Sequence, residues 1–395
     1  MVIQNLRIGY LEPASAASTP CGVSGRKNSG KERGKPERAI IRQRMPLWRD
    51  RFNWPIRRIQ KAHWLTLLII SAILPFSAAA TIFGTDDRVD LFEAPNGDYA
   101  RLADSVVSLF TADRVIVAGG TGRLSLTKYS DLYAETGVPM CATEKFRNQS
   151  RGAYCSGSLV APDTIMTASH CINGIPGKMD GIPCASIRFI FGFAVKKEGQ
   201  YPDSVPASEI YSCARVIVSR DKNNGADFAL IKLDRPVRGH TPLEINRGAS
   251  VVPGAGVFLI SYPMGLPLKI GLGKVRRRDA WNSVFVTDLD TSKGSSGGPI
   301  FNVATGKVEG ILVRGSINDS DYTHESGCVG SVVIAQDAGG GSVATDISVI
   351  RPFIPESAAK KPDETGILYP SMAGDMKMKS AIFDKLMSGQ ALPFD

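Results

Sequence analysis

From Thr81 onward the chain is a succession of short runs rich in β-branched and aromatic residues, separated by glycine and proline. Such runs are typical of β-strands bounded by turns. The clearest are "SVVSLF", "RVIVAGG", "SIRFIFGF", "EIYSCARVIVS", "DFALIKL", "VFLISYP" and "KVEGILVRG". No long stretch has a helical period. The pattern therefore predicts an all-β domain, a sandwich or barrel of antiparallel strands, with "GLGK" at Gly271 as a hairpin turn.

The positive charge of the chain is concentrated at its N-terminus. The formal net charge is +9, but residues 1–80 hold 14 of the 47 Lys and Arg and 4 of the 38 Asp and Glu. The remaining chain is therefore almost neutral. A basic excess that is confined to a leader does not give the rest of the protein a phosphate-binding surface, so we expect no nucleic acid as a partner.

The leader has the three parts of a secretory signal. A basic stretch, "RDRFNWPIRRIQKAH", precedes the apolar run "WLTLLIISAILPF", and small residues follow at Ala78 and Ala80. The apolar run has 13 residues, whereas a membrane span needs roughly 20. We therefore expect cleavage near Thr81, no permanent membrane anchor, and a secreted or periplasmic protein.

Cysteine usage agrees with export. One cysteine lies in the leader, and an even number, six, follows it. An even count after a signal peptide is typical of disulfides in an oxidising compartment. The chain has no CxxC pair, so a zinc ribbon is not expected, and we predict no metal and no cofactor.

These boundaries divide the chain into three parts. Residues 1–80 form the basic leader and signal peptide, residues 81–355 the β-rich domain, and residues 356–395 a C-terminal tail. Within the tail, "KMKSAIFDKLMSGQ" predicts a short amphipathic helix closed by Gly389.

Three motifs in the β-rich domain carry a base, an acid and a hydroxyl. His170 stands directly before the closing cysteine of "CSGSLVAPDTIMTASHC", where a short rigid loop would hold it. Asp227 precedes an apolar strand in "GADFALIKLDRPV", and Ser296 lies in "TDLDTSKGSSGGPIFN". Each residue alone has a structural explanation, but together and in this order they indicate a catalytic triad. We expect the Ser296 hydroxyl and a His170 ring nitrogen to lie within hydrogen-bond reach.

The three motifs resemble those of the chymotrypsin-like serine proteases. "TASHC" is similar to that family's "TAAHC", "DFAL" to its "DIAL", and "GSSGGP" to its "GDSGGP". The resemblance covers about Thr81 to Pro355 and is finer for the bacterial secreted branch related to glutamyl endopeptidases, through "GTDDRVDL", "LDTSKGSSGGPIFN" and "GKVEGILVRG".

The resemblance implies a double antiparallel β-barrel and a serine endopeptidase that is a monomer and acts on proteins or peptides. Its triad would be His170, Asp227 and Ser296, and the backbone N–H groups of Gly294 and Ser296 would form the oxyanion hole. The animal enzymes carry an aspartate before the nucleophile, which pairs with a freed N-terminus; here that residue is Ser295. Activation by such an ion pair is therefore not expected.

The resemblance also implies a disulfide between Cys155 and Cys171, beside the catalytic histidine. The other four cysteines allow three pairings. We prefer Cys184 with Cys213, because their strands could be neighbours in a meander, which leaves Cys141 with Cys328.

The substrate pocket is less well defined by sequence. Asp290 stands six residues before Ser296, where trypsin carries its specificity acid, and Thr291 follows. Asp290 is either that pocket acid or a buried structural carboxylate. The pocket wall would be Val313, Arg314 and Gly315. The histidine of glutamyl endopeptidases would fall at Leu312, which argues against a preference for glutamate.

Two other functional classes remain compatible with the sequence. A protease-like fold that has lost turnover could serve as a binding or regulatory module, although an intact triad argues against this. A membrane-tethered interaction protein could use the basic N-terminal segment, and an uncleaved leader would distinguish it from a secreted enzyme.

Overall fold

The computed structural model describes residues 82–174, 181–222, 225–315, 322–325 and 327–356. The predicted signal peptide and the predicted C-terminal helix lie outside these residues. No helix within the described ranges is long and apolar enough to cross a membrane.

The first barrel is a closed ring of six antiparallel strands. In spatial order they are β10 (Ile187–Ile190), β12 (Ile210–Asp221), β13 (Asp227–Leu233), β9 (Thr164–Thr167), β8 (Cys155–Ala161) and β3 (Val106–Thr111). Every residue of β8 is buried, which its uninterrupted run of small and apolar side chains permits.

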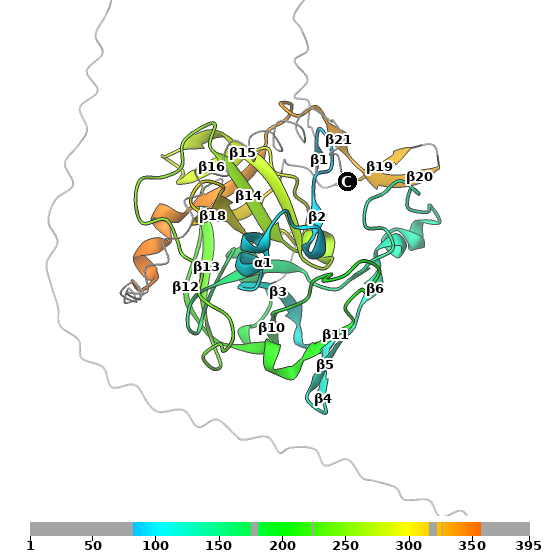
Figure 1. The fold of residues 1–395 in the computed structure, drawn as a ribbon, viewed down its shortest axis with the longest axis horizontal. Coiled ribbons are helices and arrows are strands. Elements are labelled where there is room, and N and C mark those ends of the chain that lie inside the picture. The colour runs from blue at the N-terminus through cyan, green and yellow to red at the C-terminus, as the bar shows by residue number, and fades with distance from the viewer. Residues whose placement is uncertain (1–81, 175–180, 223–224, 316–321, 326, 357–395) are drawn as a thin grey trace, which may run out of the picture. The chain divides into compact units, whose positions relative to one another are not determined.

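The second barrel repeats this plan. Its ring contains β14 (Gly256–Ser261), β17 (Pro299–Asn302), β18 (Val308–Arg314), β22 (Ser342–Asp346), β16 (Val284–Thr287) and β15 (Lys269–Asp279). The pairing of β15 with β14 closes the ring, and β2 (Val89–Asp90) adds to β15. In Figure 1 the strands of this barrel, mostly yellow, lie above those of the first, in cyan and green. The predicted double antiparallel barrel is confirmed.

The remaining elements decorate the two barrels. Among the described residues, the α-helices are α1 (Gly97–Ala103) and the single turn α2 (His170–Asn173), and short 3-10 turns join several strands. Strands β4 (Val115–Ala118), β5 (Thr121–Leu124) and β11 (Ser204–Pro206) form a separate three-stranded arm, which projects from the first barrel in Figure 1. Short two-stranded sheets join β1 (Ile82–Phe83) to β21 (Val333–Ile334), β6 (Thr127–Lys128) to β7 (Ser150–Arg151), and β19 (Tyr322–Glu325) to β20 (Cys328–Ser331).

One turn prediction is wrong. The "GLGK" sequence lies inside β15 and not in a hairpin turn. Its second glycine, Gly273, is explained by crowding: a Cβ atom there would lie 2.8 Å from Asp288 Oδ1 and 3.0 Å from Leu289 Cδ2. The glycine therefore permits close packing within the barrel instead of reversing the chain.

One apolar core runs through the first barrel and into the second. Leu109, Phe189 and Ile231 of the first barrel belong to the same buried cluster as Phe258 and Phe301 of the second. The two barrels therefore bury apolar surface against each other, and residues carried by one can be held in a fixed position relative to the other.

Three disulfides link the described cysteines. Cys155 bonds to Cys171, Cys184 to Cys213, and Cys141 to Cys328. All three expected pairings are confirmed. Cys184 directly precedes the β10 region and Cys213 lies in β12, and these two strands are hydrogen-bonded neighbours.

Candidate active site

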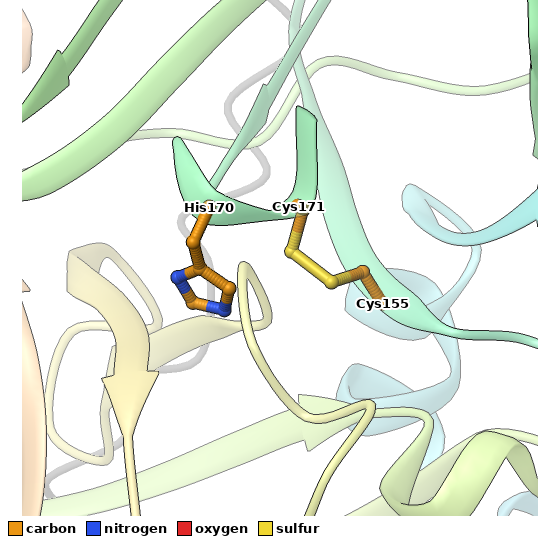
Figure 2. Close-up of side chains that lie close together, drawn as sticks. All are labelled: Cys155, His170 and Cys171. Atoms are coloured by element: carbon orange, nitrogen blue, oxygen red, sulfur yellow. A yellow bond between two sulfur atoms is a disulfide. The ribbon is translucent and has the colours of Figure 1, made fainter. Parts of the chain in front are cut away.

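His170 is carried by a tightly fixed turn. Strand β9 ends at Thr167, and α2 begins at His170. The Cys155–Cys171 disulfide ties this turn to the start of β8, and Figure 2 shows the bond directly beside the histidine. His170 is 9% exposed, so its ring is confined while part of it can still meet solvent or a bound molecule.

Asp227, the first residue of β13, orients the ring. Its Oδ2 lies 2.6 Å from His170 Nδ1. Its Oδ1 accepts the backbone N–H groups of Ser169 at 2.6 Å and His170 at 3.3 Å. Because a carboxylate only accepts, Nδ1 carries the proton and Nε2 is left as the accepting nitrogen. That is the tautomer a general base needs.

The second barrel supports Asp227. Thr345 Oγ1, on β22, accepts the N–H of Asp227 and donates to its carbonyl oxygen, each at 2.9 Å. Asp227 is 3% exposed. The acid of the proposed triad is therefore fixed by groups from both barrels.

Ser296 lies in the loop before β17 and is half-buried. Its carbonyl oxygen accepts the N–H of Ser156 at 2.8 Å and lies 3.7 Å from Cys171 Sγ, beside His170. Within the described residues, the Ser296 hydroxyl makes no hydrogen bond to the His170 ring. The structure thus joins acid to base and brings the serine loop beside them, while the contact between hydroxyl and ring remains a prediction. Such contacts are often long before substrate binds.

Ser156, which follows Cys155 in β8, holds the serine loop in place. Its Oγ donates to the carbonyl of Gly294 at 2.7 Å and accepts the N–H of Tyr262 at 2.9 Å. The sequence reasoning missed this residue. The only signal was its place in "CSGS", directly after a cysteine expected to flank the histidine.

The two expected oxyanion-hole residues have open amides. Neither the N–H of Gly294 nor that of Ser296 donates a hydrogen bond to another group in the described part of the chain. Gly294 has φ +92°, and a Cβ there would lie 2.5 Å from Tyr262 O. Only glycine suits this position. The loop conformation therefore leaves two backbone donors free to bind an oxygen atom.

Asp290 is buried against the N-terminal segment. Its Oδ1 accepts the N–H of Phe83, in β1, at 2.7 Å, and the residue is 4% exposed. Burial and the neighbouring Asp87 raise the pKa of Asp290 well above its usual value. Of the two interpretations of Asp290, this geometry favours the structural carboxylate.

Hydroxyl groups line the region beside Asp290. Thr291 Oγ1 lies 2.8 Å from Ser342 Oγ, and a Cβ on exposed Gly315 would lie 3.3 Å from Thr291 Oγ1. Val313 is buried. The guanidinium of Arg314 is directed elsewhere and donates to the carbonyl of Gly225 at 3.0 Å. Ser342 was missed from sequence because it ends a glycine-rich stretch, "DAGGGS", whose composition predicts a loop.

One cluster of metal-ligand residue types occurs in the described ranges. It contains Cys155, His170 and Cys171, with ligand atoms within 4.8 Å of one another. The two sulfur atoms are bonded to each other, and zinc binds cysteine as the thiolate. This cluster is therefore a disulfide next to a histidine and not a metal site.

The family comparison agrees with this geometry. Residues 155–311 match the family model described as a trypsin-like peptidase domain. The matched region spans parts of both barrels and contains His170, Asp227 and Ser296. The chain carries a trypsin-like peptidase domain, which supports a chymotrypsin-like serine protease. The resemblance first noted in its motifs is thus confirmed, and so is its assignment as a serine endopeptidase.

Relatives of this protease include a trypsin from Sarcophaga bullata, 25% identical over 196 residues, which cover 43% of this chain and 72% of the relative. The snake venom serine protease pictobin from Bothrops pictus is 24% identical over 192 residues, covering 42% and 71%.

Similar solved structures include a Glu endopeptidase in complex with MPD, with TM-score 0.39, 19% identity, and 68% of this chain and 96% of that chain covered. Another is the serine endoprotease from Yersinia pestis, with TM-score 0.38, 16% identity and 66% of both chains covered.

Proposed function

We propose that this protease cleaves peptide bonds through an acyl-enzyme, with Ser296 as nucleophile, His170 as general base and acid, and Asp227 as the group that orients His170. The observation that carries the proposal is the 2.6 Å contact between Asp227 Oδ2 and His170 Nδ1, on a turn fixed beside the Ser296 loop. It leaves Nε2 able to take the proton from the serine hydroxyl.

In the first half of the reaction, Ser296 Oγ attacks the carbonyl carbon while His170 removes its proton. The C–N bond then breaks, the amine leaves with the proton held by His170, and the acyl group stays on Ser296 as an ester. In the second half, His170 deprotonates a water molecule that attacks the ester. The acid product leaves and the proton returns to Ser296.

The N–H groups of Gly294 and Ser296 bind the negative oxygen that develops in each half of the reaction. Their freedom from other hydrogen bonds among the described residues supports this role. Losing one such donor typically costs about 10²- to 10³-fold in turnover.

The residue before the scissile bond is not selected by a carboxylate in this proposal. The Asp290 carboxyl is buried and accepts the Phe83 amide through Oδ1, whereas the Thr291 hydroxyl, paired with that of Ser342, lies beside Gly315. These neutral groups favour an uncharged or hydrogen-bonding side chain over Lys or Arg.

We place the enzyme outside the cytoplasm, as a monomer acting on proteins or peptides. Three disulfides support an oxidising compartment. N-terminal sequencing of the exported protein tests this: a start near Thr81 supports secretion, and an intact leader in the membrane fraction contradicts it.

The catalytic proposal is tested by steady-state hydrolysis of an unstructured protein substrate by Ser296→Ala, His170→Ala and Asp227→Asn. Each variant should lose about 10⁴-fold or more in turnover. Ser208→Ala is the matched control. Ser208 is exposed and lies in the turn before β12, so this variant should retain activity. Cleavage by Ser296→Ala at the wild-type rate would contradict the proposal, and a folded wild type without hydrolysis would favour a silent protease-like module.

A further inference from the structure

Two residues at the end of β18, Arg314 and Gly315, lie beside different parts of the molecule. Successive side chains of a strand point to opposite sides. A Cβ on Gly315, the residue after the strand, would lie 3.3 Å from the Thr291 hydroxyl, whereas the side chain of Arg314, the last residue of β18, reaches toward the start of β13. Its Nη2 donates to the carbonyl of Gly225, two residues before Asp227. The Arg314 guanidinium therefore lies beside the segment that leads into Asp227, apart from the Thr291 hydroxyl.

Arg314 has donors available on this side. A guanidinium carries five N–H groups, and within the described residues the Gly225 carbonyl is its one hydrogen-bond partner. Arg314 is half-buried. The charges of Asp227 and Asp221 both act on it, but neither carboxylate is hydrogen-bonded to it among the described residues, and both oxygens of Asp227 already accept bonds from His170 and Ser169. The cation is thus held beside the triad without a bound carboxylate from the described chain.

An extended substrate would present its side chains to these two environments in alternation. If the residue before the scissile bond fills the pocket at Thr291 and Gly315, the residue before that one faces the Arg314 side. We propose that Arg314 binds an acidic side chain, Asp or Glu, at the second residue upstream of the scissile bond. This inference rests on the proposed proteolytic function and names a substrate class for it.

The chemistry favours a carboxylate over its amide. An arginine and a carboxylate form charge-assisted and often bidentate hydrogen bonds, which a neutral amide of the same shape cannot match. A half-buried guanidinium is also less screened by water and salt than an exposed one.

The test uses two fluorogenic peptides that differ only at this position, one with Glu and one with Gln. The wild type should show a kcat/KM for the Glu peptide about 10-fold higher than for the Gln peptide, or ~1.4 kcal/mol. Arg314→Gln should bring the ratio close to one. Arg123→Gln, which removes an exposed cation on the arm strand β5, is the control and should keep the wild-type ratio.

Each outcome decides the inference. A wild-type ratio near one, or an unchanged ratio in Arg314→Gln, overturns it. Should Arg314→Gln fail to fold, the wild type is assayed in low and high salt, where the ratio must fall as salt rises; a salt-independent ratio overturns the inference. If neither peptide is cleaved faster by the wild type than by Ser296→Ala, proteolysis itself has failed. Cleavage of the Gln peptide with no Glu preference would refute only the role of Arg314.

Discussion

At the scale of single residues, two buried carboxyls near the N-terminal segment have unusual electrostatics. Asp87 Oδ1 and Asp290 Oδ2 each lack a hydrogen-bond partner in the described part of the chain. Burial and the charge of Asp86 raise the pKa of Asp87 from 3.8 to about 7. The pKa of Asp290 is raised mainly by burial and then by the charge of Asp87. Between these two pKa values, Asp87 therefore keeps a proton in the folded protein that it releases in the unfolded chain.

This proton makes stability depend on pH. Since the pKa of Asp87 is 3.8 in its ordinary state and about 7 when folded, the free energy of unfolding should fall as pH rises between these values. The slope from one group is at most about 1.4 kcal/mol per pH unit. Asp87→Asn should flatten that part of the profile, measured by thermal unfolding from pH 4 to 8. Parallel profiles for variant and wild type would show that Asp87 does not hold the proton.

A second prediction at this scale concerns Ser156. Ser156→Ala would leave the Gly294 carbonyl and the Tyr262 amide without their hydrogen-bond partner. Each buried polar group without a hydrogen bond lowers stability by about 1–3 kcal/mol. We expect kcat to fall about 10-fold or more with a smaller change in KM, because the serine loop loses its support. Ser158→Ala is the matched control, since Ser158 is equally buried and its hydroxyl has no partner among the described residues. Equal kinetics for the two variants would remove Ser156 from this role.

At the scale of elements, sequence patterning identified most barrel strands but not all. The runs "DFALIKL" and "VFLISYP" match β13 and β14 because these strands are buried at nearly every residue and most of their side chains are apolar. Strand β15 was not predicted, because its glycines and its "RRR" run are not typical strand residues, although its buried and half-buried positions partly alternate. The run "RVIVAGG" is a strand, β4, but it lies on the exposed arm. Local patterning reports strand content and cannot report what a strand packs against.

The Cys155–Cys171 disulfide should fix the turn that carries His170. Replacing both Cys155 and Cys171 with alanine opens a loop with a sequence separation of 16 and should cost about 3 kcal/mol of stability. It should also lower kcat, because the His170 turn is released. Removing Cys184 and Cys213, separated by 29 residues, is the control. It should cost a similar stability but much less kcat, as judged by chemical denaturation and steady-state kinetics. A larger loss of kcat in the control would contradict this account.

At the scale of the whole molecule, the candidate site depends on contacts between the barrels. Thr345 of the second barrel supports Asp227 of the first, and Ser156 of the first supports the Ser296 loop of the second. The three motifs could be recognised from sequence because each is a short local pattern. Their supports could not, because Ser156, Thr345 and Ser342 are single hydroxyl residues whose partners lie more than 50 positions away.

The N-terminal segment gives a prediction at this scale. It contacts the second barrel through the backbone N–H of Phe83 and not through a terminal ammonium, and Ser295 is uncharged and fully buried. A protein with extra residues before Ile82 should therefore hydrolyse a peptide ester at close to the rate of one starting near Thr81. An extended form that is inert until it is trimmed to one defined terminus would reveal a zymogen switch.

The central claim is that Ser296 becomes acylated with help from His170. Incubation with a fluorophosphonate, followed by peptide mass spectrometry, tests it most directly, because the reagent captures an activated serine covalently. The account predicts one adduct per chain, located on Ser296, strongly reduced in His170→Ala and absent in Ser296→Ala. An adduct on another serine, or no adduct in a folded wild-type protein, would contradict it.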